Sequence, residues 1–385
     1  MRHWITLLLC ALLAACASAP PAVPAPTQLL KDALFAAPAR PVSAKEVFRL
    51  SDDMRRFIDQ QLTFKLRQTN GSQRALVETL YRQQELKLEY DTAQTRNAAE
   101  AFAARSGNCL SLVIMTAAFA KELGLPVHYQ SAIVEDMWSR TGDLYFVNGH
   151  VNLALGRRLA DARTVYDGDQ YVVVDFLPAS DIRGLRTREI SEATVVAMYM
   201  NNRAAEAMAH GNIDDAYWLA REAVLQDPAF RPAYNTLGVV YLRAGHAAEA
   251  DQVFAQVLVG DPANLVALSN RAAALRALGR DAEAERITQR LAQLEPYPPF
   301  HFFKLGVAAM GTGDYRSARD WFAKEVDRAG YYHEFHFWLG VAHLRLGETA
   351  QARQHLQLAL EQSTTRGDHD LYAAKLALLK SKRTQ

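Results

Sequence analysis

Residues 197–365 repeat with a period of 34 residues, and no other feature constrains the fold of this chain as strongly. One register of the repeat holds only small residues, at Ala204, Gly238, Ala272, Gly306 and Gly340. A second register holds alanine alone, at Ala216, Ala250, Ala284, Ala318 and Ala352. At a third position of the repeat the side chains vary in size, with Ala220, Phe254, Thr288, Phe322 and Leu356. Because small residues let helices approach closely and larger ones fill the space between them, the pattern predicts five stacked helix pairs.

Pro228, Pro262 and Pro296 end the first three units, as expected where a helix cannot continue. The period and the pattern of small and large residues resemble the tetratricopeptide repeat (TPR) family. The resemblance implies an all-α TPR superhelix over residues 197–365, closed by a capping helix within residues 366–385. It also implies a protein or peptide partner that binds in the concave groove of the superhelix.

The positions that would line this groove are mostly apolar or aromatic. They are Asn235, Val239, Ser269, Arg276, Phe300, Phe303, Val307, Met310 and Phe337. Such a groove suits an extended peptide or the surface of another domain. The alternative, that part of the groove packs against the rest of this chain, stays open at this point.

The N-terminus has the composition of a targeting segment. A basic start is followed by an apolar run, Trp4–Leu13, that is too short to span a bilayer. Residues 13–16, Leu-Ala-Ala-Cys, resemble the lipobox of bacterial lipoproteins, which implies a signal peptide over residues 1–16 and lipidation of Cys16. The alternative is a secretory signal that is cleaved near Ala19.

The residue after Cys16 is alanine rather than aspartate, which in the lipoprotein family favours the outer membrane, facing the periplasm. Residues 17–42 are rich in alanine and proline and are therefore expected to form an extended tether. From residue 43 to residue 105 helical patterns dominate, with Ser51, Ser72 and Thr95 as the expected N-caps.

Cysteine counting singles out Cys109. Of the three cysteines, Cys10 lies in the predicted signal peptide and Cys16 would be lipidated. Cys109 would then be a lone thiol in an oxidising compartment, without a partner for a disulfide. The apolar run Leu110–Leu123 predicts a buried helix that begins at the cysteine, where unpaired N–H groups favour a thiolate. A nucleophile is the favoured interpretation, and a buried inert cysteine is the alternative.

Three strands are expected after this helix, over Val127–Val134, Leu144–Leu155 and Gln170–Leu177. The resulting layout is α+β, a helix that carries Cys109 packed on an antiparallel sheet. His150 and Asp175 are polar residues among the apolar ones of the second and third strands. A thiol nucleophile needs a base within hydrogen-bond reach and an acceptor that orients this base, and the order Cys109, His150, Asp175 supplies both.

Residues 95–178 resemble the transglutaminase-like superfamily of cysteine enzymes, and the closest likeness is to bacterial proteins that join such a domain to TPR repeats. The resemblance rests on Arg-Ser-Gly-Asn-Cys up to residue 109, Leu-Gly-Leu-Pro-Val up to 127, Gly-His-Val-Asn-Leu over 149–153 and Val-Asp-Phe over 174–176. It implies a transglutaminase-like domain over residues 43–190. Within that domain it implies Cys109 as nucleophile, His150 as general acid and base, and Asp175 as the residue that orients His150.

The resemblance further implies an acyl-enzyme mechanism on amide bonds, with the acyl group passing to an amine or to water. The backbone N–H of Cys109 would be one oxyanion donor, and the second donor, a side chain upstream of the cysteine in this family, has no assigned residue. Asp161, Asp167 and Asp169 are alternatives to Asp175, and His150 could instead be a structural strand histidine. The substrate would be a protein or peptide, including peptides of peptidoglycan.

Composition argues against other classes of function. The net charge is +1 without a basic stripe, so a nucleic-acid partner is not expected. There is no phosphate-binding glycine loop, and no cofactor or metal site is expected, since only His333 and His336 have a ligand-like spacing. Two hypotheses remain: a membrane-anchored periplasmic cysteine enzyme whose repeats recruit a partner, and a non-catalytic scaffold in which both domains bind proteins.

Overall fold

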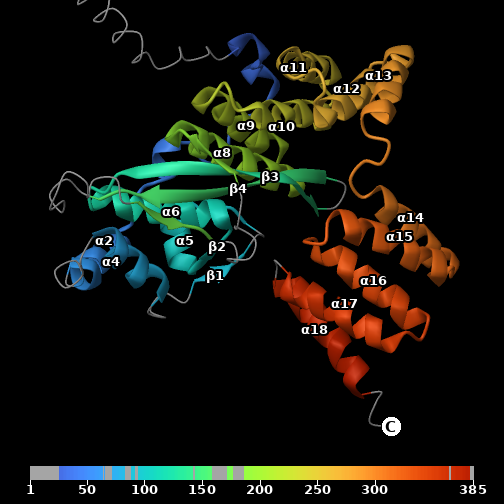
Figure 1. The fold of residues 1–385 in the computed structure, drawn as a ribbon. Helices are drawn as coiled ribbons and strands as arrows, with labels where there is room; N and C mark the ends of the chain where they lie inside the picture. The colour runs from blue at the N-terminus through green and yellow to red at the C-terminus, as the bar shows by residue number, and fades with distance from the viewer. Residues whose placement is uncertain are drawn as a thin grey trace, which may run out of the picture.

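The computed structural model has an N-terminal region with a small antiparallel sheet, followed by stacked helix pairs (Figure 1). It describes residues 26–63, 65, 72–82, 88–91, 94–141, 144–157, 171–176, 186–363 and 366–381. Among these residues no helix is long and apolar enough to cross a membrane.

The N-terminal region has four described α-helices and six described strands. The helices are α2 (Asp52–Phe57), α4 (Ser72–Val77), α5 (Ala98–Ala104) and α6 (Cys109–Glu122), with short 3-10 and π turns beside them. The strands are β1 (Glu89–Tyr90), β2 (Ser106–Gly107), β3 (Val127–Thr141), β4 (Leu144–Leu155), β5 (Val172–Val174) and β6 (Arg186–Ile190). The main sheet has the order β5-β4-β3-β6 with every neighbouring pair antiparallel, whereas β1 and β2 form a separate parallel pair. The sequence predicted β3, β4 and β5 but not β6.

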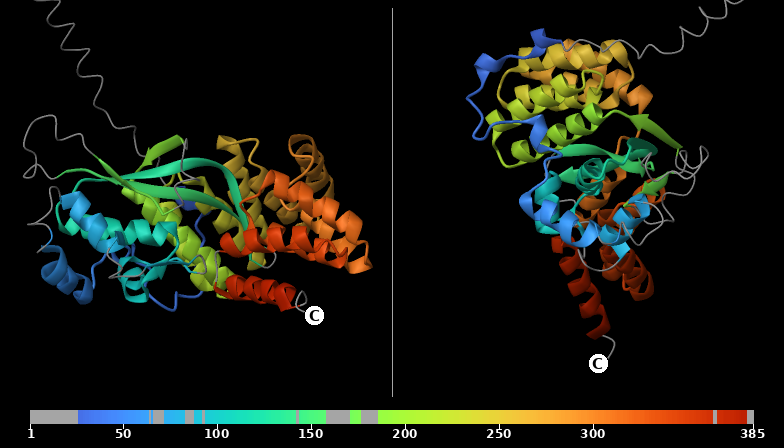
Figure 2. Two further views of the ribbon diagram at one scale, coloured as in Figure 1. Left: turned by 60° about the horizontal axis from the view of Figure 1, so that its bottom comes forward. Right: turned by 90° about the vertical axis from the view of Figure 1, so that its left-hand side faces the viewer.

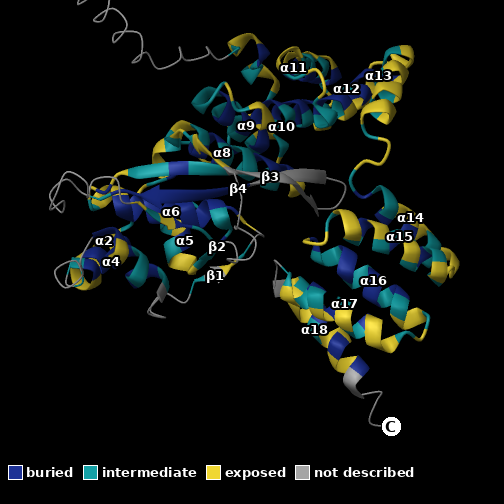
Figure 3. Ribbon diagram, in the orientation of Figure 1, coloured by how far each residue is buried: buried dark blue, intermediate teal, exposed yellow. Residues whose placement is uncertain are grey.

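Helix α6 is the core of this region. The Asn108 side chain caps it by accepting a hydrogen bond from the backbone N–H of Ser111 at 2.9 Å. Its residues from Leu110 to Ala120 are all buried, so the apolar run is surrounded on every side, as the sequence predicted (Figure 3). The helix packs against β4 on one face of the sheet, and the first helix of the repeats covers the other face (Figure 1).

The repeats consist of five helix pairs and a closing helix. These are α8 (Glu192–Ala209) with α9 (Ile213–Gln226), α10 (Arg231–Arg243) with α11 (Ala247–Gly260), α12 (Leu265–Ala277) with α13 (Asp281–Leu294), α14 (His301–Thr312) with α15 (Tyr315–Arg328), α16 (His333–Arg345) with α17 (Thr349–Glu361), and α18 (Arg366–Ser381). The turn inside each pair contains a glycine with positive φ, at Gly211, Gly245, Gly279, Gly313 and Gly347. These glycines recur at the 34-residue period, so every pair turns in the same way.

The stack of pairs is interrupted after α13. Helix α11 packs against α12 and α15 against α16, but α13 and α14 make no comparable contact. An extended connection joins them and ends at Phe300, a buried residue with a φ of 64° (Figure 2). The first pairs share one hydrophobic core with the sheet, whereas α14–α16 enclose a separate core. The sequence predicted one continuous superhelix because the 34-residue register runs through this connection unchanged.

The segment from Pro26 onward lies on the repeats and does not stand clear of them, as a tether over 17–42 would. The Phe35 ring stacks on Tyr217 with ring centroids 4.0 Å apart. The Tyr241 hydroxyl accepts from the Lys31 N–H (2.9 Å) and donates to the Leu29 carbonyl (2.7 Å). Proline and alanine content predicted an extended chain, but the tyrosines that hold this segment lie about 200 positions away in the sequence and give no local signal.

Candidate functional site

Cys109 is the first residue of α6, and its thiol is free and partly exposed. The helix starts here because Gly107 ends β2 and Asn108 takes the extended conformation of an N-cap. A cysteine in this position lies at the positive end of the helix dipole, with its own backbone N–H not used within the helix. The residue predicted as nucleophile therefore stands at the surface end of a buried helix.

His150 and Asp175, predicted as base and orienting residue, are in direct contact. His150 lies on β4 and is only 1% exposed. Its Nε2 atom is 2.8 Å from Oδ1 and 2.9 Å from Oδ2 of Asp175, which directly follows β5. The β4–β5 register pairs Leu153 with Val174, which brings Asp175 opposite Asn152 and within reach of the histidine.

The pKa of His150 reflects this environment. Burial alone would lower the pKa of His150. Hydrogen bonds and electrostatic attraction to Asp175 and Cys109 outweigh burial and raise this pKa from 6.5 to about 9. Since Nε2 is used by Asp175, Nδ1 is the nitrogen that is left for Cys109. The three residues thus form a chain of contacts, from thiol to imidazole to carboxylate, in which the imidazole is protonated near neutral pH.

Two further side chains complete the site, and the sequence analysis missed both. Asn152 Nδ2 donates to Asp175 Oδ2 at 2.8 Å and helps to fix the carboxylate that contacts His150. Tyr90, paired with Gly107 across β1 and β2, lies close enough to Cys109 for its hydroxyl to interact with the backbone N–H and the side chain of the cysteine. Although 42% of Tyr90 is exposed, desolvation of its hydroxyl and the neighbouring charge of Cys109 raise the pKa of Tyr90, so the hydroxyl keeps its proton.

Asn152 could have been found in the sequence, because it lies two positions after His150 and so on the same strand face. Tyr90 could not, since two-residue strands leave no periodic pattern. Among the alternatives, Asp161, Asp167 and Asp169 lie outside the described residues, as do Cys10 and Cys16.

His333 and His336, the two histidines with ligand-like spacing, contact different neighbours. His333 Nδ1 contacts the Tyr372 hydroxyl at 2.8 Å, whereas His336 Nδ1 lies 3.1 Å from His355 Nδ1 on the next helix. Within the described part of the chain, no three histidine, cysteine, aspartate or glutamate side chains come together as metal ligands. His333 and His336 thus point to different neighbours despite their spacing.

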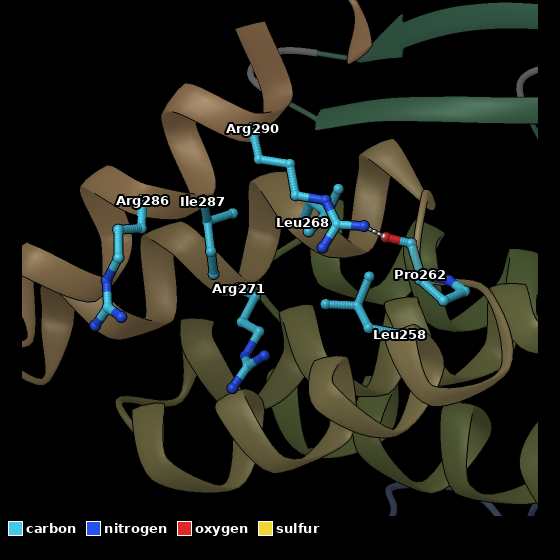
Figure 4. A pocket seen from close by; sticks show the side chains of 7 residues that line it. All are labelled: Leu258, Pro262, Leu268, Arg271, Arg286, Ile287 and Arg290. Atoms are coloured by element: carbon cyan, nitrogen blue, oxygen red, sulfur yellow. Dashed lines mark hydrogen bonds between the residues drawn. The ribbon is translucent and has the colours of Figure 1, made fainter. Parts of the chain in front are cut away.

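The repeats contain a pocket of about 260 Å³ between α11, α12 and α13. Its floor is apolar, with Leu258, Leu268 and Ile287, and three arginines surround it (Figure 4). Arg271 Nε donates to Asp251 Oδ1 (2.7 Å), and Arg290 Nη2 donates to the Pro262 carbonyl (2.9 Å).

The predicted groove is only partly open. Phe300 and Phe303 are 2% and 3% exposed and pack against Phe335 in the core of α14–α16, so neither is available to a ligand. Val239 and Met310 are half-buried, whereas Val307 is exposed. The two phenylalanines occupy groove positions of the repeat pattern, but the connection after α13 turns this face of α14 into a local core.

Comparison with known proteins identifies the repeats. The tetratricopeptide repeat family model matches residues 335–363, which form most of α16 and α17. The TPR repeat-containing protein YvcD of Bacillus subtilis (strain 168) is 25% identical over 150 residues. These are 38% of this chain and 31% of YvcD, so the match spans less than a third of that relative.

Solved structures to which this chain is similar include a TPR protein. The TPR protein TTC0263 of Thermus thermophilus has 18% identity and a TM-score of 0.30, over 47% of this chain and 99% of that chain. PilF of Pseudomonas aeruginosa has 20% identity and a TM-score of 0.29, over 49% of this chain and 86% of that chain. The 34-residue period, the helix pairs with their glycine turns and the matched repeat together make the C-terminal, all-helical part of this chain a TPR region.

Proposed function

We propose that this protein is a transglutaminase-like cysteine enzyme that acts on amide bonds of a protein or peptide, with repeats that bind the partner or substrate. The observation that carries the proposal is the contact of a buried His150 with the Asp175 carboxylate through Nε2, in a place where Cys109 is near enough to raise the pKa of the same imidazole. A protonated imidazole between a carboxylate and a thiol is the arrangement that holds a cysteine as a reactive thiolate.

In the proposed reaction, the Cys109 thiolate attacks the amide carbonyl carbon and forms a tetrahedral oxyanion. The backbone N–H of Cys109 and the Tyr90 hydroxyl are both close enough to the thiol to donate to this oxygen. His150 then gives its proton to the leaving amine, which breaks the C–N bond and leaves a thioester. An amine or a water molecule, deprotonated by His150, attacks the thioester and releases Cys109.

The experiment that tests this proposal separates alkylation from acylation of Cys109. Iodoacetamide reacts by displacement and needs no oxyanion donor, whereas p-nitrophenyl acetate acylates through an oxyanion. We expect Tyr90→Phe to alkylate at about the wild-type rate but to be acylated roughly 10- to 1000-fold more slowly. Both reactions are followed by mass spectrometry, with Cys109→Ala as the blank.

Two outcomes would contradict parts of this proposal. Equal loss of alkylation and acylation in Tyr90→Phe would remove Tyr90 from the oxyanion site and leave it a packing role. A wild-type Cys109 that is not acylated at all would refute the enzyme. The non-catalytic scaffold would then be the better description, since the TPR region binds protein or peptide partners in either case.

We also propose that residues 1–16 are a lipoprotein signal peptide and that Cys16 carries the lipid, which places the protein at the outer membrane facing the periplasm. The support is the Leu-Ala-Ala-Cys sequence and the alanine that follows it. In a bacterial host we expect radioactive palmitate in the wild-type protein and in Cys109→Ser, and none in Cys16→Ser. Label that persists in Cys16→Ser would contradict the proposal.

A further inference from the structure

A buried hydrogen-bond network joins α8, the first helix of the repeats, to the N-cap of the helix that carries Cys109. Its centre is Thr95, which is 1% exposed. From α8, Glu206 Oε1 accepts from the Thr95 backbone N–H at 2.6 Å, and Arg203 Nη1 donates to the Thr95 carbonyl at 3.1 Å. Asn202 Nδ2 donates to the Thr95 hydroxyl at 3.3 Å. Three side chains of α8 thus hold one residue of the N-terminal region.

The same hydroxyl holds Asn108, the residue before Cys109. Asn108 Nδ2 donates to Thr95 Oγ1 at 2.9 Å, while Asn108 Oδ1 accepts from the Ser111 N–H at 2.9 Å and its hydroxyl at 2.8 Å. The Ser111 N–H can only be satisfied by an oxygen, so the Asn108 amide has one possible orientation, with its nitrogen toward Thr95. The orientation of the cap therefore depends on a hydroxyl that α8 keeps in place.

The sequence predicted a different role for Thr95, as an N-cap. The cap of α5 is instead Asn97, in a capping box with Glu100. Thr95 does not cap the helix that follows it, and its hydroxyl and both backbone groups make contacts that cross to α8. A buried threonine with no local role but four long-range polar contacts is best explained by the connection it makes.

We propose that Thr95 is a positioning residue for Cys109 and that, through Thr95 and Asn108, the first repeat helix sets the reactivity of the cysteine. The inference rests on the function proposed above for Cys109. The Asn108 cap fixes the direction of the first turn of α6, and with it the thiol relative to His150 and the N–H that would bind the oxyanion. A partner that shifts α8 on binding the repeats would change the reactivity of Cys109 by the same route.

The test measures the pH dependence of Cys109 alkylation by iodoacetamide in the full chain. Thr95→Val removes the hydroxyl but keeps the size and shape of the side chain, and Glu206→Met removes the acceptor on α8. We expect both variants to react roughly 10- to 100-fold more slowly than wild type at about pH 6.5, with a profile displaced toward that of a free thiol. Thr95→Ser and Glu206→Gln keep the polar groups and should restore the wild-type profile.

A matched control is Asn264→Ala, which removes the N-cap of α12 in the repeats, a helix without a link to α6. It should lower the thermal stability of the repeats and leave the alkylation profile of Cys109 unchanged. Wild-type profiles in both Thr95→Val and Glu206→Met would overturn the proposal, and so would slow reaction in Thr95→Ser.

Amide hydrogen exchange at residues 109–113 gives a second measurement that does not depend on catalysis. We expect faster exchange there in Thr95→Val than in wild type, because the cap loses a fixed partner. If Cys109 reacts independently of His150, the proposed enzymatic function is wrong. The exchange rates still test whether α8 stabilises the Asn108 cap through Thr95. Unchanged exchange in Thr95→Val would then refute the link by itself.

Discussion

At about pH 6, Cys109 of the Asp175→Asn variant is expected to be alkylated by iodoacetamide roughly 100-fold more slowly than in wild type. The Asp175 carboxylate is among the groups that raise the pKa of His150 to about 9. Without this charge the imidazole loses its proton near neutral pH, and a neutral imidazole no longer stabilises a thiolate beside it. The rate of the variant should instead rise with pH like that of an isolated thiol, whereas the wild-type rate stays high from about pH 6 upward.

His150→Ala removes the imidazole altogether and should give the same pH profile as Asp175→Asn or a slower one. The matched control is Glu189→Gln, which alters a second histidine–carboxylate pair on the same sheet, His128 Nδ1 with Glu189 Oε1 at 2.9 Å. That pair is exposed, with side chains 38% and 70% accessible, and has no cysteine beside it. An effect of Glu189→Gln equal to that of Asp175→Asn would mean that the change in reactivity arises from the net charge of the sheet.

The same pKa shift makes stability depend on pH. His150 binds its proton more tightly in the folded chain, at a pKa of about 9 against an ordinary 6.5, so the folded state holds more protons between these values. The stabilisation that protonated His150 adds to the free energy of unfolding is fully present below about pH 6.5 and is lost as the pH rises through about 9. In Asp175→Asn this dependence should largely disappear, which urea unfolding at both pH values would show.

The sequence predicted Cys109, His150 and Asp175 as one site because strand periodicity puts polar residues on a defined face. The structure places His150 and Asp175 in contact, and the catalytic roles of the three residues stay a prediction. The remaining parts of the site were not readable. Tyr90 reaches Cys109 through a two-residue strand pair, and Thr95 reaches Asn202 and Glu206 across more than a hundred positions. Contacts of this kind leave no periodic pattern, because they depend on how regions pack rather than on how one element folds.

The fold was predictable for a similar reason. Helix α6 and strand β4 were expected within one residue of their observed bounds, since long apolar runs specify their own structure. Strand β6 was missed because it pairs only with β3 at one edge of the sheet, and its sequence, Arg-Thr-Arg-Glu-Ile, is mostly polar. The interruption after α13 was not predicted, because the 34-residue spacing of small and large residues indicates where the helix pairs lie but not whether successive pairs are in contact.

Gly238→Leu is expected to lower the free energy of unfolding of the repeats by about 3 kcal/mol. A Cβ atom at Gly238 would lie 2.5 Å from Cε1 of Phe254, a ring that is fully buried on α11 and cannot move aside. Helix propensity acts in the opposite direction, because leucine is favoured over glycine by less than ~1 kcal/mol within a helix. Overpacking therefore outweighs propensity, and thermal or urea unfolding of the purified chain should show a net loss.

The control for Gly238→Leu is Gly311→Leu. Gly311 lies in α14 with nothing within 4 Å of its Cβ position, so the substitution gains propensity without a clash and should stabilise by roughly 0.5–1 kcal/mol. The repeats themselves follow the same rule. Glycine faces a large residue at Gly238–Phe254, Gly306–Phe322 and Gly340–Leu356, and alanine stands where the partner is smaller, at Ala204–Ala220 and Ala272–Thr288.

This pairing predicts that the two positions are coupled. Phe254→Ala alone should destabilise by about 3–5 kcal/mol through the cavity it leaves, but a leucine at position 238 can fill part of that space. The double variant Gly238→Leu/Phe254→Ala should therefore lose less stability than the sum of the two single variants. If the stability losses of the two single variants simply add in the double variant, the side chains at positions 238 and 254 do not compete for the same space. That result would contradict close helix approach as the reason for the small residue in each repeat.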